Sequence, residues 1–328
     1  MIAEVGEAHF CSKGGDGTAA YLIKKAGYLL LVLLCISFLS FLLANVSPLD
    51  PAEAYARRVS RFASEETIEQ YREKMGFHRS VPAQYLSWLR QVVRLDFGSS
   101  YISKRPVLKE LEAALPATLL IAAFAAVFIL ILAIPLGILA AYYESGVADR
   151  IIGALSFLIV SVPGYFAGLL ALLTFGMRLR MFPVIGHKNI VSMVFAAFVL
   201  ALPMIGSLIR ILRSLLLENK EKEYIQYAKA RGISRRNIMV RHLLRNALPS
   251  CITMFGQNVG YLIAGTAVVE TIFSIPGVGQ YALTAALNRD FPVINCYIVL
   301  SALFFVLCNL IAELFSMLFQ PQLKEGYR

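Results

Sequence analysis

Residues 223–249 read EYIQYAKARGISRRNIMVRHLLRNALP and form a strongly charged stretch between two long apolar segments. Between residues 210 and 249, ten Lys or Arg residues stand against three Glu residues. Loops that flank membrane helices carry such an excess of basic residues on the cytosolic side. If the apolar segments on either side span a membrane, this stretch is a cytosolic loop through which a partner protein could move them.

The overall composition indicates that the apolar segments do span a membrane. Of the 328 residues, 58% are hydrophobic and 16% are charged, whereas soluble domains have roughly 45–50% apolar and about 25% charged residues. The formal net charge of +10 would suggest nucleic acid as a partner of a soluble protein. Here we interpret the basic residues as loop charges and expect no nucleic acid. The five cysteines show no CxxC spacing, so neither a disulfide framework nor a metal site is predicted.

Six stretches of the chain are long and apolar enough to span a membrane, which takes about 20 residues. With the basic loop in the cytosol, they predict an all-α integral membrane protein with both termini cytosolic. We expect residues 1–25 to form a cytosolic tail and residues 47–112 a long extracytoplasmic loop. Pro163 and Pro203 predict kinks, which either help to open a path or only curve the helices for packing. The six stretches are residues 26–46, 115–142, 151–175, 190–210, 251–271 and 293–319.

The spanning stretches also lack the groups that an ion-coupled carrier uses. Away from the ends of the stretches, Glu313 is the one ionisable residue, whereas such carriers keep carboxylates or histidines at membrane depth. The chain has no Gly-x4-Gly-Lys-Ser/Thr loop, so no ATP site of that kind is expected. We therefore predict no enzyme activity in this chain, and active transport would take its energy from another subunit.

The first half of the charged stretch predicts a short helix that ends at a glycine. Glu221 and Glu223 lie early in this helix, and Lys229 and Arg231 lie in its last turn, as the helix dipole favours. Gly232 is placed to close the helix in a left-handed conformation. Residues at i, i+3, i+4 and i+7 share one helix face, and this face would form a compact knob able to enter a cleft on a partner. The residues on it are Tyr224, Tyr227, Ala228 and Arg231.

The second half of the stretch predicts another helix. Ser234 can cap it at residue 235, and we expect Pro249 to stop it before the fifth apolar stretch. Arg241 and Arg245 lie four residues apart on this helix. Two interpretations remain open at this point. The helix could lie on anionic lipid headgroups as a basic amphipathic helix, or it could belong to a docking site for a partner protein.

The whole stretch resembles the EAA-type cytosolic loop of binding-protein-dependent ABC importer permeases, in particular the dipeptide, oligopeptide and nickel family. That loop has Glu-Ala-Ala, three further residues and then Gly. Here Gln226, Tyr227 and Ala228 precede Gly232, so Ala and Gly match and the acidic first position does not. By this resemblance, the residues that couple the permease to an ATPase are Tyr224, Gln226, Tyr227, Ala228, Arg231 and Gly232.

Four further segments resemble the first permease of the pair in this family, and they occur in the family's order. They are LDFGSS at residues 95–100, LPATL at 115–119, ETIF followed by PGVG at 270–279, and RDFPV at 289–293. The motif positions within them are Asp96, Gly98, Glu270, Pro276, Gly277, Gly279, Asp290 and Pro292. Each segment alone is a weak signal, whereas the ordered set is a specific one.

The resemblance implies a six-helix type I ABC importer permease in the bacterial cytoplasmic (inner) membrane. The permease domain would cover residues 26–328, with the extracytoplasmic insertion at 47–112 and the cytosolic coupling loop at 211–250. Its partners would be a second homologous permease in a heterodimer, two cytosolic ATPases, an extracytoplasmic substrate-binding protein and membrane lipid. ATP and Mg would be bound by the partner subunits, and this chain would hold no cofactor.

The resemblance leaves the cargo open between di- or oligopeptides and nickel or a nickel chelate. The outer insertion, with Trp88 and residues 76–84, is either a dock for the binding protein or a cap that only shields the pore mouth. Two functions of other classes are weighed against the importer. They are an ion-coupled secondary carrier, which the missing buried charges disfavour, and a membrane scaffold without a transport role.

Overall fold

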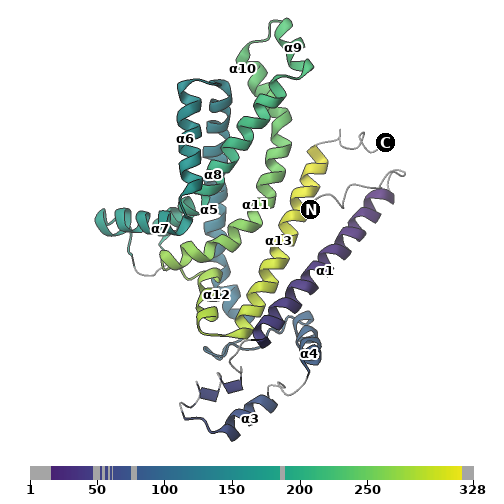
Figure 1. Cartoon of the computed structure of the whole chain (residues 1–328), viewed down its shortest axis with the longest axis vertical. Coiled ribbons are helices and arrows are strands. Elements are labelled where there is room, and N and C mark those ends of the chain that lie inside the picture. Colours follow the sequence, from purple (N-terminus) through teal and green to yellow (C-terminus); the bar gives the residue numbers. More distant parts are fainter. Residues whose placement is uncertain are drawn as a thin grey trace.

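The computed structural model describes residues 16–46, 52–53, 56–57, 60, 62–74, 80–184 and 189–319. Within these ranges, only the backbone is described for residues 16–26, 43–46, 74, 257 and 313–319. The side chain of Glu313 and residues 76–79 of the segment 76–84, considered as a dock or a cap, therefore lie outside the description. All regular secondary-structure elements in the described part of the chain are helices (Figure 1).

Long helices form a bundle, most short helices lie towards its two ends, and α7 projects from its side (Figure 1). The long helices are α1 (Asp16–Val46), α5 (Val107–Tyr142), α6 (Val147–Ser161), α8 (Ile190–Lys220), α11 (Leu244–Ile272) and α13 (Phe291–Phe319). The short ones are α3 (Glu65–Lys74), α4 (Val81–Val93), α7 (Gly164–Ala171), α9 (Glu223–Ala230), α10 (Arg235–Asn237) and α12 (Val278–Leu287), with π-helical turns η1 (Leu172–Arg178) and η2 (Ile238–Leu243). In Figure 1, α9 and α10 lie at the top, whereas α12, α4 and α3 lie in the lower part.

A helix covers most of each of the six predicted stretches, but the third is not a straight span. Among the described residues, three helices are long and apolar enough to cross a membrane, and five spans result if each bent pair counts as one. The third stretch is bent by 97° between α6 and α7. Pro163 lacks a backbone N–H and Val162 before it is extended (φ −82°, ψ 123°), so the helix cannot continue there. The predicted kink is therefore a right-angle break.

Three predicted helix boundaries are wrong or displaced. The fourth helix runs to Lys220 rather than residue 210, and α1 begins at Asp16, inside the predicted tail. Pro249 lies within α11 and does not stop it. A proline in a membrane helix removes one backbone hydrogen bond, a loss that neighbouring helices can compensate. Because Pro249 is buried among such neighbours, the helix continues through it.

Small residues allow the central helices to approach closely. On α5, Ala125, Ala133 and Ala140 are fully buried in the main core. A Cβ added to Gly137 would lie 2.9 Å from Cδ2 of Leu212 on α8, which leaves no space for a larger residue. Membrane helices pack through van der Waals contact between such small side chains, because lipid provides no hydrophobic drive for association. The core is therefore centred on the α5–α8 pair.

The predicted outer insertion is attached to the bundle through the contact of α4 with α1. The Trp88 ring lies 5.7 Å from the Phe41 ring and 5.9 Å from the Tyr85 ring. The hydroxyl groups of Tyr85 and Ser37 lie 2.8 Å apart and share a hydrogen bond. Trp88, which we considered as part of a dock for the binding protein, thus packs against α1 and helps to hold the insertion in place.

Candidate functional site

The helix α9 ends in the conformation that its sequence predicts. Gly232 has φ +72°, in the left-handed region. Its N–H donates to the carbonyl of Lys229 (2.9 Å), and the N–H of Ile233 donates to the carbonyl of Ala228 (3.2 Å). These two bonds make a Schellman motif, which satisfies the last carbonyls of a helix. The predicted cap at Ser234 is also present, since its hydroxyl accepts from the Asn237 N–H at 3.4 Å.

The face that α9 turns outward differs from the predicted one. Ala228 is 5% exposed and belongs to the main core, and Tyr224 packs against that core with its hydroxyl oxygen buried. Of the predicted knob, Tyr227 is 71% exposed and Arg231 is exposed. Tyr224 and Ala228, which we predicted to enter a partner's cleft, are instead covered by the protein's own core.

The outward stripe of α9 is displaced by one residue from the prediction. Spacing alone shows which residues share a face, but it does not show which face a neighbouring helix covers. The fully buried Ile225, next to Tyr224, fixes the rotation of the helix against the core. The exposed residues at i, i+3, i+4 and i+7 are Glu223, Gln226, Tyr227 and Ala230.

At the lower end of the bundle, the carboxylate of Glu270 caps α12. Glu270 is 0% exposed. Its Oε2 accepts from the Gln280 N–H at 2.8 Å, and its Oε1 accepts from the Thr118 hydroxyl at 2.6 Å. Thr118 in turn accepts from the Val278 N–H at 2.9 Å. The N-terminus of a helix carries a partial positive charge and free N–H groups, so a carboxylate is favoured there.

The glycines of the PGVG motif leave space for this cap. Gly277 is the N-cap residue of α12 and has no side chain of its own to bind the free N–H groups. A Cβ at Gly277 would lie 2.2 Å from Cδ of Glu270, in the place that the carboxylate occupies. A Cβ at Gly279 would lie 2.4 Å from Cα of Ala267 on α11. The motif residues are therefore required by one local packing arrangement.

A second buried carboxylate holds the segment between α12 and α13. Asp290 is 1% exposed. Its carboxylate accepts from the Ser100 hydroxyl and from the Tyr101 N–H, the latter at 2.9 Å. Pro292 follows in the first turn of α13, where a missing N–H costs little. Asp290 thus attaches the start of α13 to the loop that precedes α5.

The loop that Asp290 binds is itself shaped by the LDFGSS motif. Asp96 accepts a hydrogen bond from the Gly98 N–H at 2.9 Å, and Gly98 has φ +78°. The carbonyl of Gly98 accepts from the Val107 N–H at 3.0 Å, at the start of α5. A turn at a left-handed glycine allows the short Asp side chain to bond the backbone two residues on. The motif therefore positions Ser100 for its bond to Asp290.

A third contact ties the middle of α12 to α5. The Tyr281 hydroxyl donates to Glu110, which also accepts from the Ser103 hydroxyl at 2.9 Å. Burial, together with the hydrogen bond to Glu110, raises the pKa of Tyr281 above its usual value. The phenol therefore remains protonated and able to donate throughout the physiological range.

We call the contacts of Glu270, Tyr281 and Asp290 with their partners the α12 anchor. The structure brings seven of the eight motif positions together in this anchor or its supporting loop, whereas Pro276 is exposed in the turn before α12. Four residues of the anchor were not predicted from the sequence, namely Ser100, Glu110, Thr118 and Tyr281. Ser100 and Thr118 could have been found, because they lie in the LDFGSS and LPATL segments. Glu110 and Tyr281 carry no sequence signal.

Neither region offers a metal site. In the described part of the chain, no group of three or more His, Cys, Asp or Glu residues could hold a metal ion. The arrangement at α9 and at the α12 anchor provides hydrogen bonds, packing and an exposed helix face, which are means of transmitting motion.

Two family descriptions match the chain. "Binding-protein-dependent transport system inner membrane component" matches residues 133–325, and "Binding-prot-dependent transport system membrane comp, N-term" matches residues 19–122. Together these matches include the α9 segment and all three contacts of the α12 anchor.

Relatives match over nearly their full lengths. Among them is the metal-staphylopine import system permease protein CntB of Staphylococcus aureus (strain NCTC 8325 / PS 47), which is 29% identical over 94% of this chain and 99% of the relative. The oligopeptide transport system permease protein AppB of Bacillus subtilis (strain 168) is 33% identical over 93% of this chain and 99% of the relative. A solved inward-facing structure of the MetNI methionine ABC transporter has a similar fold, with a TM-score of 0.55 and 19% identity, over 65% of this chain and 97% of that one.

Proposed function

The chain belongs to the binding-protein-dependent permeases of ABC importers, and from that membership we propose the cargo, the partners and the part that each end of the bundle plays. The permease moves peptides or a metal chelate across the bacterial inner membrane. Its energy comes from separate ATPase subunits, which hold the ATP and Mg. The chain itself carries out no chemical reaction.

The observation that carries this proposal is the helix α9. It follows α8 and precedes α10, η2 and α11, so any force on it reaches two long helices through the backbone. Its inner face, with Ile225 and Ala228, is packed on the main core, while Tyr227 and its neighbours are exposed. A short helix held in this way can transmit a push without being deformed itself. Its exposed stripe is the surface that we assign to an ATPase.

The proposed topology follows from this assignment. The basic loop of residues 211–250 lies in the cytosol with both termini, and the α12 anchor and residues 47–112 lie on the outer side. A second homologous permease completes the membrane unit as a heterodimer. Two cytosolic ATPases bind at the end of the bundle that carries α9, and an extracytoplasmic binding protein delivers the cargo at the opposite end. An ion-coupled carrier or a scaffold would not copurify with an ATPase, so copurification separates the importer from both.

The cargo is proposed from the relatives and is tested on the binding protein. AppB is named for oligopeptide transport and CntB for import of metal-staphylopine, so we propose peptides or metal chelates, with nickel among the metals. The test is calorimetry on the cognate extracytoplasmic protein with peptides, Ni(II) alone and Ni(II) chelates. Binding of peptides alone would assign the peptide branch, and binding of a chelate alone would assign the metal branch. Binding of none of them would contradict the proposed cargo.

Replacement of Gly232 tests the role of α9. Gly232→Val places a β-branched residue at φ +72°, where the left-handed conformation costs an L-residue about 1–2 kcal/mol. No atom lies within 4 Å of the added Cβ, so the strain is confined to the backbone. We expect the variant complex to assemble and hydrolyse ATP, while cargo moved per ATP falls by about 5- to 30-fold, the equilibrium factor for that strain. The measurement is uptake and hydrolysis in the same proteoliposomes.

Gly232→Asn is the matched control, because asparagine tolerates the left-handed region better than other residues with a Cβ. It should retain most of the coupling. If Gly232→Val moves as much cargo per ATP as the parent complex, the assignment of α9 as the coupling element is wrong. If both variants lose coupling equally, the left-handed exit of α9 is not the reason.

A further inference from the structure

Three basic side chains that flank α9 in the sequence all bind one turn of the chain. Arg213 and Lys220 lie on α8 before α9, and Arg235 lies at the start of α10 after it. Their common target is the turn between α5 and α6, residues 142–149, which we call the α5–α6 turn. This turn is about 80 residues away from α9 in the sequence, so the tertiary structure alone brings the two together.

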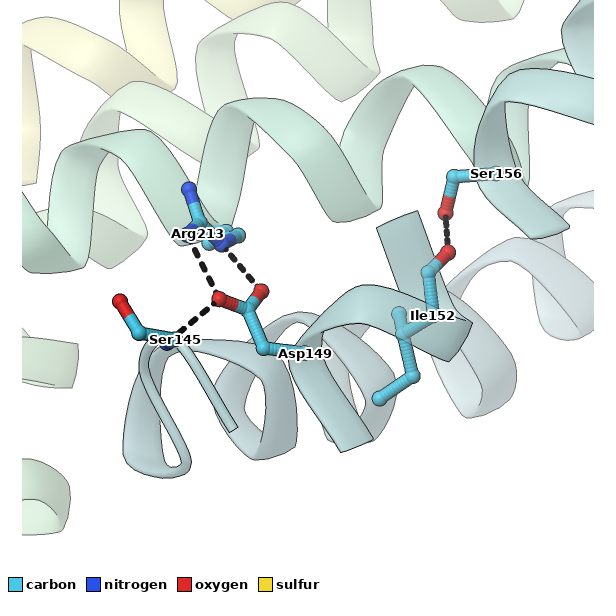
Figure 2. A network of polar contacts seen from close by, with 5 residues as sticks. All are labelled: Ser145, Asp149, Ile152, Ser156 and Arg213. Carbon is cyan, nitrogen blue, oxygen red and sulfur yellow. Dashed lines mark hydrogen bonds and ion pairs between the residues drawn. The ribbon is translucent and has the colours of Figure 1, made fainter. Parts of the chain in front are cut away.

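The strongest of the three contacts is a two-pronged ion pair (Figure 2). Nε of Arg213 donates to Oδ1 of Asp149 at 2.6 Å, and Nη2 donates to Oδ2 at 2.8 Å. The Ser145 N–H also donates to Oδ2, at 2.9 Å. Asp149 is 7% exposed and lies in the first turn of α6, where the helix dipole favours a carboxylate. Two parallel bonds from a planar guanidinium fix orientation as well as distance.

The other two contacts bind the turn from both ends of α9. Nζ of Lys220 forms an ion pair with Glu144. Nη2 of Arg235 donates to the carbonyl of Tyr142, and its guanidinium lies 4.7 Å from the centre of the Tyr142 ring. Each contact is partly exposed and contributes little alone. Together with Arg213 they connect the α5–α6 turn to the chain just before and just after α9.

Helices α6 and α8, which the Arg213–Asp149 pair connects, also touch further along their length. A Cβ at Gly206 on α8 would lie 2.7 Å from the carbonyl oxygen of Ser156 on α6. The Ser156 hydroxyl is directed to the Ile152 carbonyl of its own helix at 2.7 Å (Figure 2), so it does not hold the two helices apart. The α6–α8 contact therefore has a close backbone approach at Gly206 and the ion pair near the α9 end.

We propose that the α5–α6 turn is a relay through which displacement of α9 reaches α5 and α6, with Arg213 as the positioning residue that fixes the turn to α8. The backbone connects α9 to α8 and α11, and α5 and α6 are reached from α8 through packing along the helices. The three basic side chains add a polar connection to α5 and α6 at the turn nearest α9. This inference rests on the proposed function, in which an ATPase moves α9.

The test uses Arg213→Gln in the complete importer complex. The variant keeps a side chain that can hydrogen-bond but loses the charge and the two-pronged contact. We expect it to assemble and to hydrolyse ATP, while cargo moved per ATP hydrolysed falls about fivefold or more, the size of a typical coupling between sites. Arg213→Lys keeps the positive charge but cannot form two parallel hydrogen bonds, so its cargo moved per ATP should lie between that of the parent and that of Arg213→Gln. Arg210→Gln is the matched control, one turn earlier on α8 with an exposed side chain, and should leave the ratio unchanged.

Hydrogen exchange on the same complexes provides a readout that does not need transport. In Arg213→Gln the backbone amides of residues 145–149 should exchange faster than in the parent, while the amides of α9 should exchange at the parent rate. In Arg210→Gln the amides of residues 145–149 should also exchange at the parent rate. Reversal of the pair, Asp149→Arg with Arg213→Asp, should recover part of the coupling and of the protection if the contact itself is responsible. An unchanged transport ratio, unchanged exchange of the turn, or equal losses in Arg210→Gln would each overturn the relay.

The proposed function and the relay would be contradicted by different results. If the parent complex takes up cargo without needing ATP, or binds no ATPase, the proposed function is wrong and the relay falls with it. If the parent complex couples ATP to uptake and Arg213→Gln does so equally well, the relay alone is wrong.

Discussion

Gly279→Ala should reduce folded protein in the membrane more than any other single methyl addition considered for this chain. The added Cβ would lie 2.4 Å from Cα and 2.6 Å from the backbone nitrogen of Ala267. Because these are backbone atoms of α11, no change of side-chain rotamer relieves the contact. Overpacking costs typically about 1–3 kcal/mol and occasionally more, and here α12 would have to move away from α11. We expect a lower midpoint of thermal unfolding in detergent and a smaller folded fraction on size exclusion.

Gly153→Ala provides the matched control for that experiment. Gly153 lies inside α6, and no atom lies within 4 Å of a Cβ placed there. Alanine is favoured over glycine in a helix interior by about 1 kcal/mol, so this variant should be as stable as the parent or more stable. If Gly279→Ala unfolds at the same temperature as Gly153→Ala, α12 does not pack on α11 as described.

Glu270→Ala should destabilise the chain by about 3 kcal/mol. The substitution removes a helix cap, worth about 0.5–2 kcal/mol. It also leaves a second donor, the Thr118 hydroxyl, without its acceptor in a buried place, at about 1–3 kcal/mol for an unsatisfied group. One effect opposes these losses, since a buried carboxylate without a basic partner carries a desolvation cost. We expect the losses to exceed it, because two donors and the N-terminus of α12 all face the carboxylate.

Glu270→Gln separates shape from charge in this experiment. Glutamine keeps the size and one acceptor, but its amide group would oppose either the Gln280 N–H or the Thr118 hydroxyl. Its unfolding midpoint in detergent should therefore lie between those of Glu270→Ala and the parent. A midpoint for Glu270→Ala equal to that of the parent would contradict the cap.

A double substitution tests whether Gly277 is needed because of Glu270. Gly277→Ala alone should be destabilising, since its Cβ would lie 2.2 Å from Cδ of the Glu270 carboxylate. In Glu270→Ala the obstructing group is absent, so adding Gly277→Ala should cost much less than it does in the parent. Such non-additivity is expected of residues in direct contact. Additive losses would mean that the two positions act independently.

Features that depend on nearby residues were predicted from the sequence. The left-handed conformation of Gly232 and the Ser234 cap were both correct, because hydrogen bonds within a few residues decide them. A kink at Pro163 was predicted at the right position, but its bend of 97° was not. The helix stop at Pro249 was wrong, because the cost of a proline inside a membrane helix depends on the neighbouring helices.

Motif order pointed to the α12 anchor without revealing its bonds. The sequence marked Glu270 and Asp290 as motif positions, but their partners Thr118 and Ser100 lie 152 and 190 residues away. No periodicity or spacing connects residues at such separations. The missed contact between Tyr281 and Glu110 is of the same kind, with a separation of 171 residues.

The sequence by itself determined that this is a helical membrane protein with a basic loop between apolar helices and a glycine-terminated helix within that loop. Composition, charge distribution and local backbone geometry are sufficient for those conclusions. Only the tertiary structure decided which side of α9 is covered, which donors reach the buried carboxylates, and that Arg213, Lys220 and Arg235 meet on one turn. These depend on how each helix is rotated and placed against its neighbours, and close packing between distant segments sets that placement.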